Sequence, residues 1–429
     1  MKKIKKLHSI CDVSASCDKK RICVMLPQAY TGGVLDYTKR IAEAIKRGTE
    51  KTGDNYDIIF AYVESPLLDV KDYFKSIRDM GISIRKFQWK QLSYEEIVDV
   101  YRLMGVDIKP KYDTCFVPFD GGNNFLDCDV VLLTVDRVPG SVMFLQPHGL
   151  IAHDYIQRVN PKVSPSNELF DSSYISIARK AKAVFTTTPI TMEHAIQYAG
   201  ISEKRIHIIP VPCSADDDSQ QYKIDKILDD EYFLWSTNTS LHKNHIIALD
   251  AILHYYMMGG KLKCVVTGFN TEYMNPEHEL DDDCFKVPHI LKIRELIFQN
   301  NLLKNNMIFL GNLPKPMYKC VLKNANFFFH PGSSDNGNGT AFDALFLGVP
   351  TISSDYHAMR FYDTYFPLNM LFFDNTDVDD MAEKLYQADR SNDELRAKLP
   401  SKKELEKKMI DSPDIYIPIY NQIKNYLII

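Results

Sequence analysis

Short apolar runs alternate with longer amphipathic segments along the first half of the chain. Continuous apolar runs are typical of strands buried on both faces, and the amphipathic segments between them predict the helices of βα units. Strands are expected at residues 21–26, 57–63, 130–134, 141–146, 183–187 and 206–212. Gly32-Gly33-Val34 follows the first of these strands and opens a predicted helix. This half is therefore predicted to form one domain with a parallel sheet.

A break in composition separates this half from a second α/β pattern. Residues 213–228 contain Asp216-Asp217-Asp218 and few apolar side chains, which is typical of a linker. Apolar runs then return at residues 232–236, 263–268, 307–311 and 326–329. We predict an α/β chain of two Rossmann-like domains, with residues 1–212 in the first, 213–228 as the linker and 229–405 in the second.

Composition and charge narrow the class of protein. The 429 residues carry a net charge of −5, so a nucleic-acid partner is not expected. No apolar run reaches the roughly 20 residues that span a bilayer. The nine cysteines form no closely spaced pairs of the kind that bind zinc, which favours reduced thiols and a cytoplasmic location. The basic start, Met1 to Lys6, leaves a peripheral contact with an anionic membrane surface open.

The most informative segment runs from Phe327 to Asp343 and continues into residues 348–350. It predicts a buried strand, a glycine-rich turn and a helix with an acid in its first turn. Free backbone N–H groups at the start of such a helix can bind a phosphate. Asp335 and Asp343, eight residues apart, lie on either side of this cradle and can hold sugar hydroxyls. A phosphate flanked by sugars describes a nucleotide sugar.

The same segment resembles the signature of family 4 retaining glycosyltransferases. That signature has an acid, seven residues, a second acid and a short helix that ends in Gly-Val-Pro, as at Asp335, Asp343 and 348–350 here. The family normally carries glutamate at both acid positions, and many members have their glycines one residue earlier than Gly337 and Gly339. Weaker similarities, in the order that family members show them, extend the resemblance over roughly residues 20 to 390.

The resemblance implies a GT-B architecture, with the two domains facing across a cleft and residues 406–429 forming a helix that crosses back to the first domain. It implies a hexosyltransferase that moves a sugar from a nucleotide-diphosphate sugar to a saccharide or lipid-linked saccharide acceptor. It further implies retention at the anomeric carbon and independence of metals and cofactors. It also implies a role in bacterial surface polysaccharide synthesis at the inner membrane face. Two alternatives stay open: a nucleotide-sugar epimerase or hydrolase, and a catalytically silent homologue that binds sugar or scaffolds a partner.

The resemblance assigns donor-binding roles to a set of residues in the second domain. The diphosphate would contact Lys243 and the backbone amides of Gly337, Asn338, Gly339 and Thr340. Asp335 would hold the transferred sugar, and Asp343 would hold the ribose. A plainer interpretation exists for each charged residue: a surface lysine, a turn-forming aspartate, and a Thr340-x-x-Asp343 capping box at the helix start. The arginine that the family usually carries near the lysine is missing, and Arg360 is a candidate replacement.

In the first domain the resemblance points to His148 and Gly33. His148 follows the strand predicted at 141–146 and would face the sugar, with His153 as the competing candidate. Gly33 would let the loop after the first strand approach the diphosphate or the acceptor. Acceptor choice is expected to lie in loops such as 121–128 and 161–169, and the acidic residues 281–283 are expected to form a solvated loop.

Overall fold

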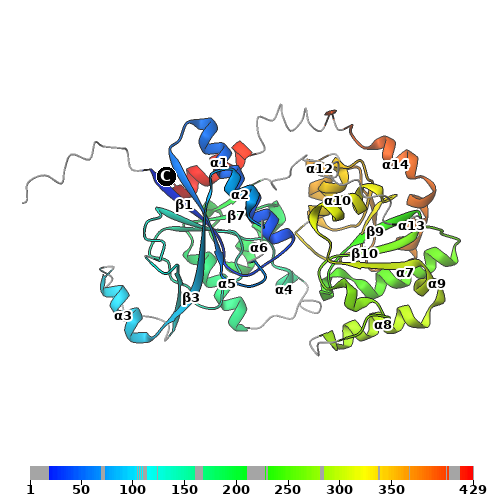
Figure 1. Cartoon of the computed structure of the whole chain (residues 1–429), viewed down its shortest axis with the longest axis horizontal. Coiled ribbons are helices and arrows are strands. Elements are labelled where there is room, and N and C mark those ends of the chain that lie inside the picture. Colours follow the sequence, from blue (N-terminus) through cyan, green and yellow to red (C-terminus); the bar gives the residue numbers. More distant parts are fainter. Residues whose placement is uncertain are drawn as a thin grey trace, which may run out of the picture. The chain divides into compact units, whose positions relative to one another are not determined.

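A computed structural model gives the fold of the chain (Figure 1). It describes residues 19–68, 73–103, 105, 107, 109, 114–122, 124–159, 168–209, 228, 230–280, 285–336, 339–366, 368–401, 403–404 and 416–428. Most of the predicted linker, the acidic residues 281–283, and both Gly337 and Asn338 lie outside these ranges. Within them, no helix combines the length and apolar character that crossing a membrane requires.

The first half of the chain folds around an eight-stranded sheet in the order β4-β3-β2-β1-β5-β6-β7-β8. Its strands are β1 (Lys20–Leu26), β2 (Tyr56–Val63), β3 (Ser83–Leu92), β4 (Cys115–Phe119), β5 (Val130–Leu133), β6 (His148–Ile151), β7 (Ala183–Thr186) and β8 (Ile206–Ile208). The helices between them are α1 (Gly33–Thr52), α2 (Lys75–Asp79), α3 (Tyr94–Leu103), α4 (Ile156–Val159), α5 (Glu168–Lys180) and α6 (Pro189–Ala199). Strands β2, β1, β5 and β6 pair in parallel, and β4 is antiparallel to β3 at the edge.

One predicted strand of this sheet is wrong. Residues 141–146 contribute only an isolated bridge between Val142 and Phe116, and the strand forms at His148–Ile151 instead. Val142 is nevertheless buried, so the apolar run serves packing and not sheet pairing. Strands β3 and β4 were not predicted. Only Phe87 and Leu92 of β3 are buried, so a strand near the sheet edge carries no continuous apolar run.

The second half folds around a six-stranded sheet in the order β11-β10-β9-β12-β13-β14, and all its pairings are parallel. The strands are β9 (Tyr232–Ser236), β10 (Lys263–Thr267), β11 (Met307–Gly311), β12 (Phe328–His330), β13 (Thr351–Ser354) and β14 (Leu371–Phe373). Its helices are α7 (His245–Met257), α8 (Pro288–Gln299), α9 (Asn301–Asn306), α10 (Lys315–Asn324), α11 (Gly339–Phe346), α12 (His357–Tyr365), α13 (Val378–Arg390) and α14 (Asn392–Lys398). The strands predicted in this half are confirmed.

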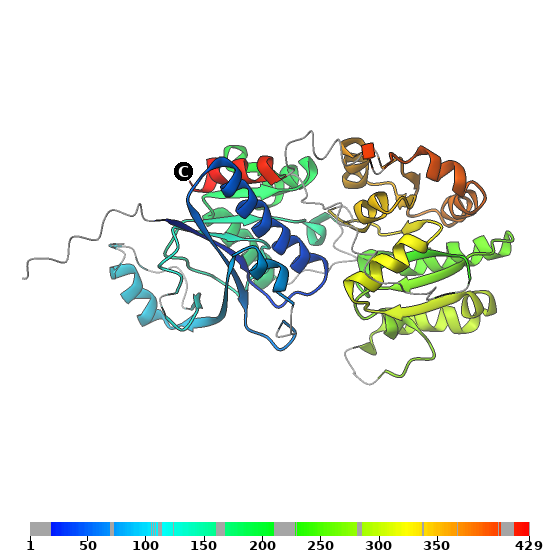
Figure 2. The ribbon, with the colours of Figure 1, turned by 45° about the horizontal axis from the view of Figure 1, so that its top comes forward.

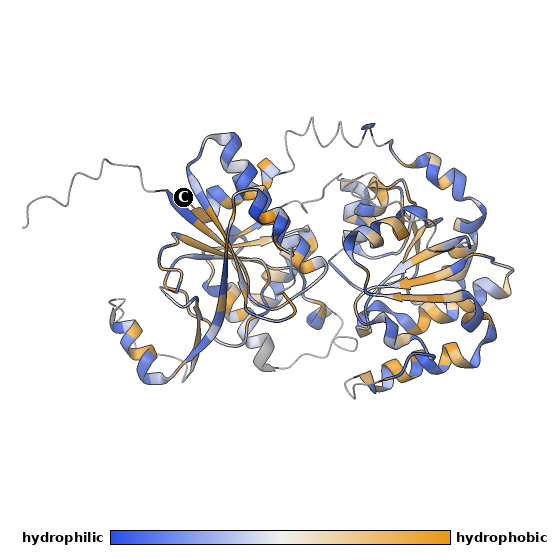
Figure 3. Cartoon of the chain, in the orientation of Figure 1, coloured by the Kyte–Doolittle hydropathy of each residue, from blue (hydrophilic) through white to orange (hydrophobic). Residues whose placement is uncertain are grey.

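Helices cover both faces of the second sheet, and the apolar strands explain why. In β9, Phe233 and Trp235 pack into a core with α7, α8 and α13, whereas Tyr232 and Leu234 pack into a second core with α10, α11 and α12. A strand whose side chains alternate between two buried faces must be apolar throughout. Figure 3 shows this apolar character along the strands of the sheet.

The described residues pack as two compact units. The first contains the described residues of Met1–Ile151, Ser176–Val184 and Tyr416–Ile429, and the second those of Ala152–Ile175 and Phe185–Ile415. Helix α16 (Tyr416–Ile423) packs on α1, where the Tyr420 ring faces Gly48. Lys424 pairs with Asp54 at 2.7 Å, and the Tyr420 hydroxyl donates to the same carboxylate. The C-terminal segment therefore belongs to the first unit, as both ribbon views show (Figure 2).

Candidate functional site

Two loops meet at the carboxyl edge of the second sheet, where ligands of open α/β sheets bind. Strands β9 and β12 are neighbours, and the loops that follow them begin at Thr237 and Pro331. The carbonyl oxygen of His242 accepts hydrogen bonds from the backbone N–H of Ser333 at 2.9 Å and from its hydroxyl at 3.1 Å. These bonds fix the turn that carries Lys243 against the loop that carries Asp335.

An ion pair joins these two loops. Nζ of Lys243 lies 2.5 Å from Oδ2 of Asp335, and the two side chains are 16% and 20% exposed. Burial raises the pKa of Asp335, but the charge and hydrogen bond of Lys243, with a further contribution from the neighbouring His242, lower it below its ordinary value. The structure therefore brings together two predicted site residues that are 92 positions apart in sequence and keeps Asp335 as a carboxylate.

Two histidines border this ion pair. His330 ends β12 and is fully buried, with its Nε2 2.8 Å from the hydroxyl of Tyr356. Burial lowers the pKa of His330 to about 3, and the Lys243 charge adds to the effect. Burial and Lys243 also lower the pKa of His242, against opposing contributions from Asp335 and Asp154. Both rings are therefore neutral at pH 7, and Lys243 is the cationic side chain of this group.

Helix α11 begins at Gly339, so the plainer interpretation of Thr340 and Asp343 as a capping box does not hold. Thr340 is the second helical residue and cannot be the N-cap, and Asp343 lies in the second turn and not the first. Gly337 and Asn338 precede the described start of the helix and lie outside the described residues. Gly339 is exposed, and a Cβ there would meet nothing within 4 Å. The capping explanation for Asp343 is thereby removed.

A tyrosine from α10 joins the α11 residues. The Tyr318 hydroxyl donates to Oγ1 of Thr340 at 2.8 Å. Burial raises the pKa of Tyr318, the Asp343 charge raises it further, and hydrogen bonds with Thr340 and Ser236 oppose this. Asp343, Thr340, Tyr318 and the end of β9 are therefore neighbours. Nothing in the sequence pointed to Tyr318, because a tyrosine in an amphipathic helix is usually a core residue.

Asn336, next to Asp335, makes a dense set of hydrogen bonds within the second unit. Its amide oxygen accepts from the hydroxyls of Thr191 at 2.6 Å and Thr188 at 3.2 Å, and its amide nitrogen donates to the Thr187 hydroxyl at 2.6 Å. Its backbone N–H donates to Oδ1 of Asp335 at 2.9 Å. These contacts orient the loop around Asp335.

His148 does not lie where the sequence predicted. It is the first residue of β6, in register with Val131 near the start of β5, so it lies towards the amino edge of the first sheet. The register position of His148 in β1 is Cys23, and β1 ends three residues, about 10 Å, further along at Leu26. Gly33 follows that carboxyl end of β1. His148 is buried, its Nε2 lies 3.3 Å from the Ile177 carbonyl, and burial lowers its pKa to about 4. This position and these contacts suit a structural histidine and not one that faces the sugar.

His153 is the histidine that follows the carboxyl end of β6. The strand ends at Ile151, and the His153 carbonyl accepts from the Thr191 hydroxyl at 3.4 Å. Thr191 also contacts Asn336, and the neighbouring Asp154 acts electrostatically on His242. The sequence predicted a strand at 141–146 and therefore placed His148 after its end. The observed strand begins at His148, so it is His153 that follows the end. A strand boundary after Pro147 would have favoured His153.

Gly33 and Arg360 have defined surroundings. A Cβ on Gly33 would meet nothing within 4 Å, and it is the preceding Gly32, at φ 66°, that needs the glycine backbone. Arg360 pairs with Asp355 at 2.6 Å and stacks over Phe372 at 3.8 Å. Its guanidinium is thus engaged in a salt bridge and a ring contact, as in the plainer interpretation of this arginine.

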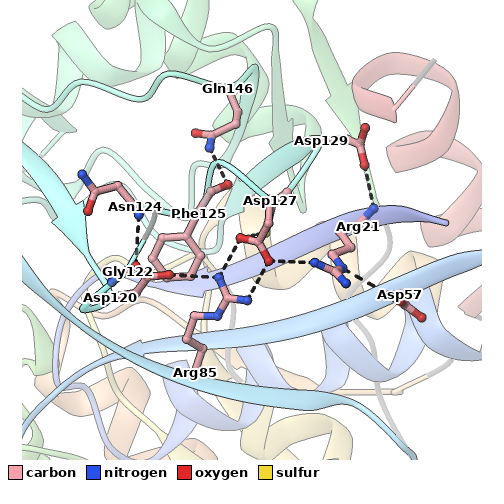
Figure 4. Close-up of polar contacts among 11 residues, drawn as sticks. Arg21, Asp57, Arg85, Asp120, Gly122, Asn124, Phe125, Asp127, Asp129 and Gln146 are labelled. Atoms are coloured by element: carbon pink, nitrogen blue, oxygen red, sulfur yellow. Dashed lines mark hydrogen bonds and ion pairs between the residues drawn. The ribbon is translucent and has the colours of Figure 1, made fainter. Parts of the chain in front are cut away.

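The loop that contains residues 121–122 and 124–128 leads into the start of β5 and therefore lies at the amino edge of the first sheet. Figure 4 shows its polar contacts. Arg85, near the start of β3, donates to Asp120 and Asp127 at 2.9 Å. Arg21, near the start of β1, also pairs with Asp127 at 2.9 Å. Gly33 marks the opposite edge, so we no longer expect this loop to select the acceptor. Of the second candidate loop, residues 161–167 lie outside the described residues.

Comparison with known proteins gives matches in structure alone. Neither a protein-family model nor a curated protein sequence matches the chain. A glycosyltransferase from Rickettsia africae ESF-5 shares 13% identity at a TM-score of 0.59, over 95% of this chain and 98% of its own. HepE from Anabaena, solved with UDP and glucose, shares 11% identity at a TM-score of 0.65, over 95% and 98%. Sucrose-phosphate synthase from Thermosynechococcus elongatus shares 12% identity at 0.62, over 95% and 99%.

These structural similarities span nearly the full length of this chain and of each protein compared with it. At such low identities they establish the fold and not the activity. The chain has the GT-B fold, an α/β architecture with two Rossmann-like sheets, as predicted.

Proposed function

We propose that this protein is a retaining glycosyltransferase that moves a hexose from a nucleotide-diphosphate sugar to a saccharide or lipid-linked saccharide acceptor. The observation that carries the proposal is the ion pair between Lys243 and Asp335 at the carboxyl edge of the second sheet, close to the N-terminus of α11. A cation, a carboxylate and a helix N-terminus at one sheet edge suit a ligand that joins a diphosphate to a sugar.

The proposed reaction depends on how the charged groups of the site stabilise the leaving diphosphate. As the glycosidic bond breaks, negative charge grows on the leaving diphosphate, and Lys243 and the amides at the start of α11 would stabilise it. Lys243 would exchange its contact with Asp335 for the phosphate, which frees the carboxylate for hydroxyls of the transferred sugar. Asp343, beside Tyr318, would hold the ribose. In this scheme the leaving phosphate takes the acceptor proton, so no carboxylate nucleophile and no metal are needed.

His153 would take the role that the sequence predicted for His148. Its position after the carboxyl end of β6 supports a contact with the sugar or the acceptor. We propose that the protein acts in the cytoplasm, with a peripheral contact at the inner membrane face. Its proposed role is in bacterial surface polysaccharide synthesis.

Ligand-induced stabilisation tests the donor half of the proposal. Melting points would be measured with UDP, GDP, ADP and CMP and their sugars, with and without EDTA, because a ligand that binds only the native state raises the melting point. We expect stabilisation by a nucleoside diphosphate that EDTA leaves unchanged and that Lys243→Met and Asp343→Ala abolish. Lys292→Met, which breaks an exposed pair with Glu295, is the matched control.

Product analysis tests the transfer half. Sugar transfer to added acceptors, with the anomeric configuration of the donor kept, supports the proposal, and His153→Ala should reduce the rate. Release of free nucleotide and sugar without an acceptor would favour a hydrolase. Binding without turnover across many acceptors would favour a silent homologue, and no stabilisation by any nucleotide would refute the proposal.

A further inference from the structure

A second element lies at the same carboxyl edge as the Lys243–Asp335 pair. The segment Gly268–Met274 follows β10, and Gly311 ends β11. β9 separates β10 from β12, so two inter-strand spacings, about 10 Å, lie between this segment and the start of the loop around Asp335. The ribose of a nucleotide whose diphosphate lies at α11 can bridge that distance, which leaves its base near the ends of β10 and β11.

The backbone of this segment is held in place. Gly268 has φ +132°, and a Cβ there would lie 1.8 Å from the Thr237 carbonyl oxygen, so only glycine fits. Its N–H donates to the carbonyl of Gly311 at 2.9 Å, and its own carbonyl accepts from the Thr271 hydroxyl at 2.8 Å. Arg294 donates to the carbonyls of Tyr273, Asn275, Pro276 and His278 at 2.5–3.1 Å. Side chains on the segment are thus carried by a rigid frame.

Two side chains on this frame are placed to meet a ligand. Phe269 is 54% exposed, so its ring is accessible for stacking. Oε2 of Glu272 is buried, and among the described residues no hydrogen-bond donor reaches it. It lies 3.2 Å from the position that a Cβ on Gly311 would take, so the carboxylate rests against the end of β11.

An unpaired, buried carboxylate oxygen is costly and calls for a donor. Glu272 as a whole is only partly buried, so its carboxylate stands at the boundary between the protein and solvent. The terminal torsion of glutamate is broad and two-fold, so a small rotation can present either oxygen to a ligand. A ligand that offers N–H groups would satisfy the carboxylate, and an aromatic ring nearby offers a surface for stacking a base.

We propose that Glu272 and Phe269 bind the nucleobase and select guanine, so that the donor is a guanosine diphosphate sugar. This inference rests on the proposed function. Guanine presents N1–H and the N2 amino group side by side, and one carboxylate can accept from both. Uracil has one N–H between two carbonyl oxygens, which repel a carboxylate. Adenine and cytosine place a ring nitrogen acceptor next to their amino group.

The test compares nucleoside diphosphates by calorimetric titration of the full chain. We expect GDP to bind at least tenfold more tightly than UDP, ADP or CDP, in line with the discrimination of about 10- to 100-fold that one bidentate base contact gives. Glu272→Gln should lower GDP affinity about tenfold and leave UDP affinity nearly unchanged. Phe269→Ala should weaken all four ligands by a similar factor, because stacking is tolerant of base identity.

Glu277→Gln is the matched control, since Glu277 lies on the neighbouring turn and its side chain is 70% exposed. The ratio of GDP to UDP affinity within each variant normalises any partial loss of folded protein. Equal affinities for the four nucleotides, or an unchanged ratio in Glu272→Gln, would overturn the inference. If binding in that case is still abolished by Lys243→Met, the proposed function stands without it. Absence of binding by any nucleoside diphosphate would overturn both.

Discussion

Replacing Lys243 with methionine removes a positive charge that counteracts the effect of burial on the pKa of Asp335. In the native protein, burial raises the pKa of Asp335, and Lys243 and His242 bring it below its ordinary value. Methionine keeps the length of the lysine stem but cannot pair with a carboxylate. We therefore expect the pKa of Asp335 to rise above its ordinary value in the variant, because burial is the largest single influence on it and only His242 and His330 then oppose it.

The magnitude follows from the exposure of the pair. Breaking a fully buried ion pair costs about 3–5 kcal/mol, and an exposed pair contributes at most about 1 kcal/mol. At 16% and 20% exposure the side chains of Lys243 and Asp335 lie between these limits. We expect Lys243→Met to lower the free energy of unfolding by about 2 kcal/mol at pH 7. Adding Asp335→Asn should restore part of the loss, since it removes the unpaired charge.

The pH dependence of the free energy of unfolding gives a second measurement. The contribution of Asp335 to this dependence has the opposite sign in Lys243→Met. The lowered pKa of Asp335 stabilises the native protein above the ordinary aspartate pKa near 4, and this contribution is lost as the pH falls through the folded pKa. With a raised pKa, the folded variant takes up a proton more readily than the unfolded chain. Part of the 2 kcal/mol deficit, about 1 kcal/mol, should therefore return between pH 7 and pH 5.

Urea unfolding can report on the second sheet alone. Trp235 is buried in that sheet, and Trp89 is the other tryptophan of the chain. Unfolding would be followed by tryptophan fluorescence in a Trp89→Phe background at pH 7 and pH 5, with Lys292→Met as the control. An equal loss at both pH values, or a double variant no more stable than Lys243→Met, would refute the argument.

Three further outcomes are expected. Burial lowers the pKa of His148 to about 4, so native stability should fall as the pH drops from 6.5 to 4, and His148→Gln should remove up to about 3 kcal/mol of this dependence in acid unfolding curves. Gly268→Ala should cost at least 3 kcal/mol in urea unfolding, because its Cβ meets a carbonyl oxygen, whereas Gly259→Ala, at φ +93° in open space, should cost about 1 kcal/mol. Gly48→Val should detach the C-terminal helix, because a Cβ would lie 2.3 Å from the Tyr420 ring, and limited proteolysis would then cut the chain near its end.

The fold was predictable because its signal is local. The apolar runs at β1, β2, β5 and β9 to β12 are long enough to be buried on both faces, and each is followed by an amphipathic segment. The strand prediction was wrong, or missed a strand, where the segment does not lie in a fully buried part of the sheet. The run at 141–146 packs as a loop, and β3 near the sheet edge has only two buried side chains.

The candidate site was predictable in part for the same reason. Gly339, Thr340 and Asp343 follow β12 in sequence, so a strand-turn-helix pattern places them at the sheet edge. The hydrogen-bond partners of this region come from elsewhere: Tyr318 of α10 contacts Thr340. Thr187 and Thr191, from the segment after β7, contact Asn336. No local pattern reports such contacts.

The sequence by itself determined the two α/β halves, the glycine-rich turn between β12 and α11, and the two acids that flank it, since these depend on short-range periodicity and spacing. Only the tertiary structure decided that Lys243 pairs with Asp335, that His153 and not His148 follows a carboxyl strand end, and that one oxygen of Glu272 is left unpaired. Which strand ends share an edge, and which polar atoms burial leaves without a partner, depend on the register and order of strands far apart in the chain.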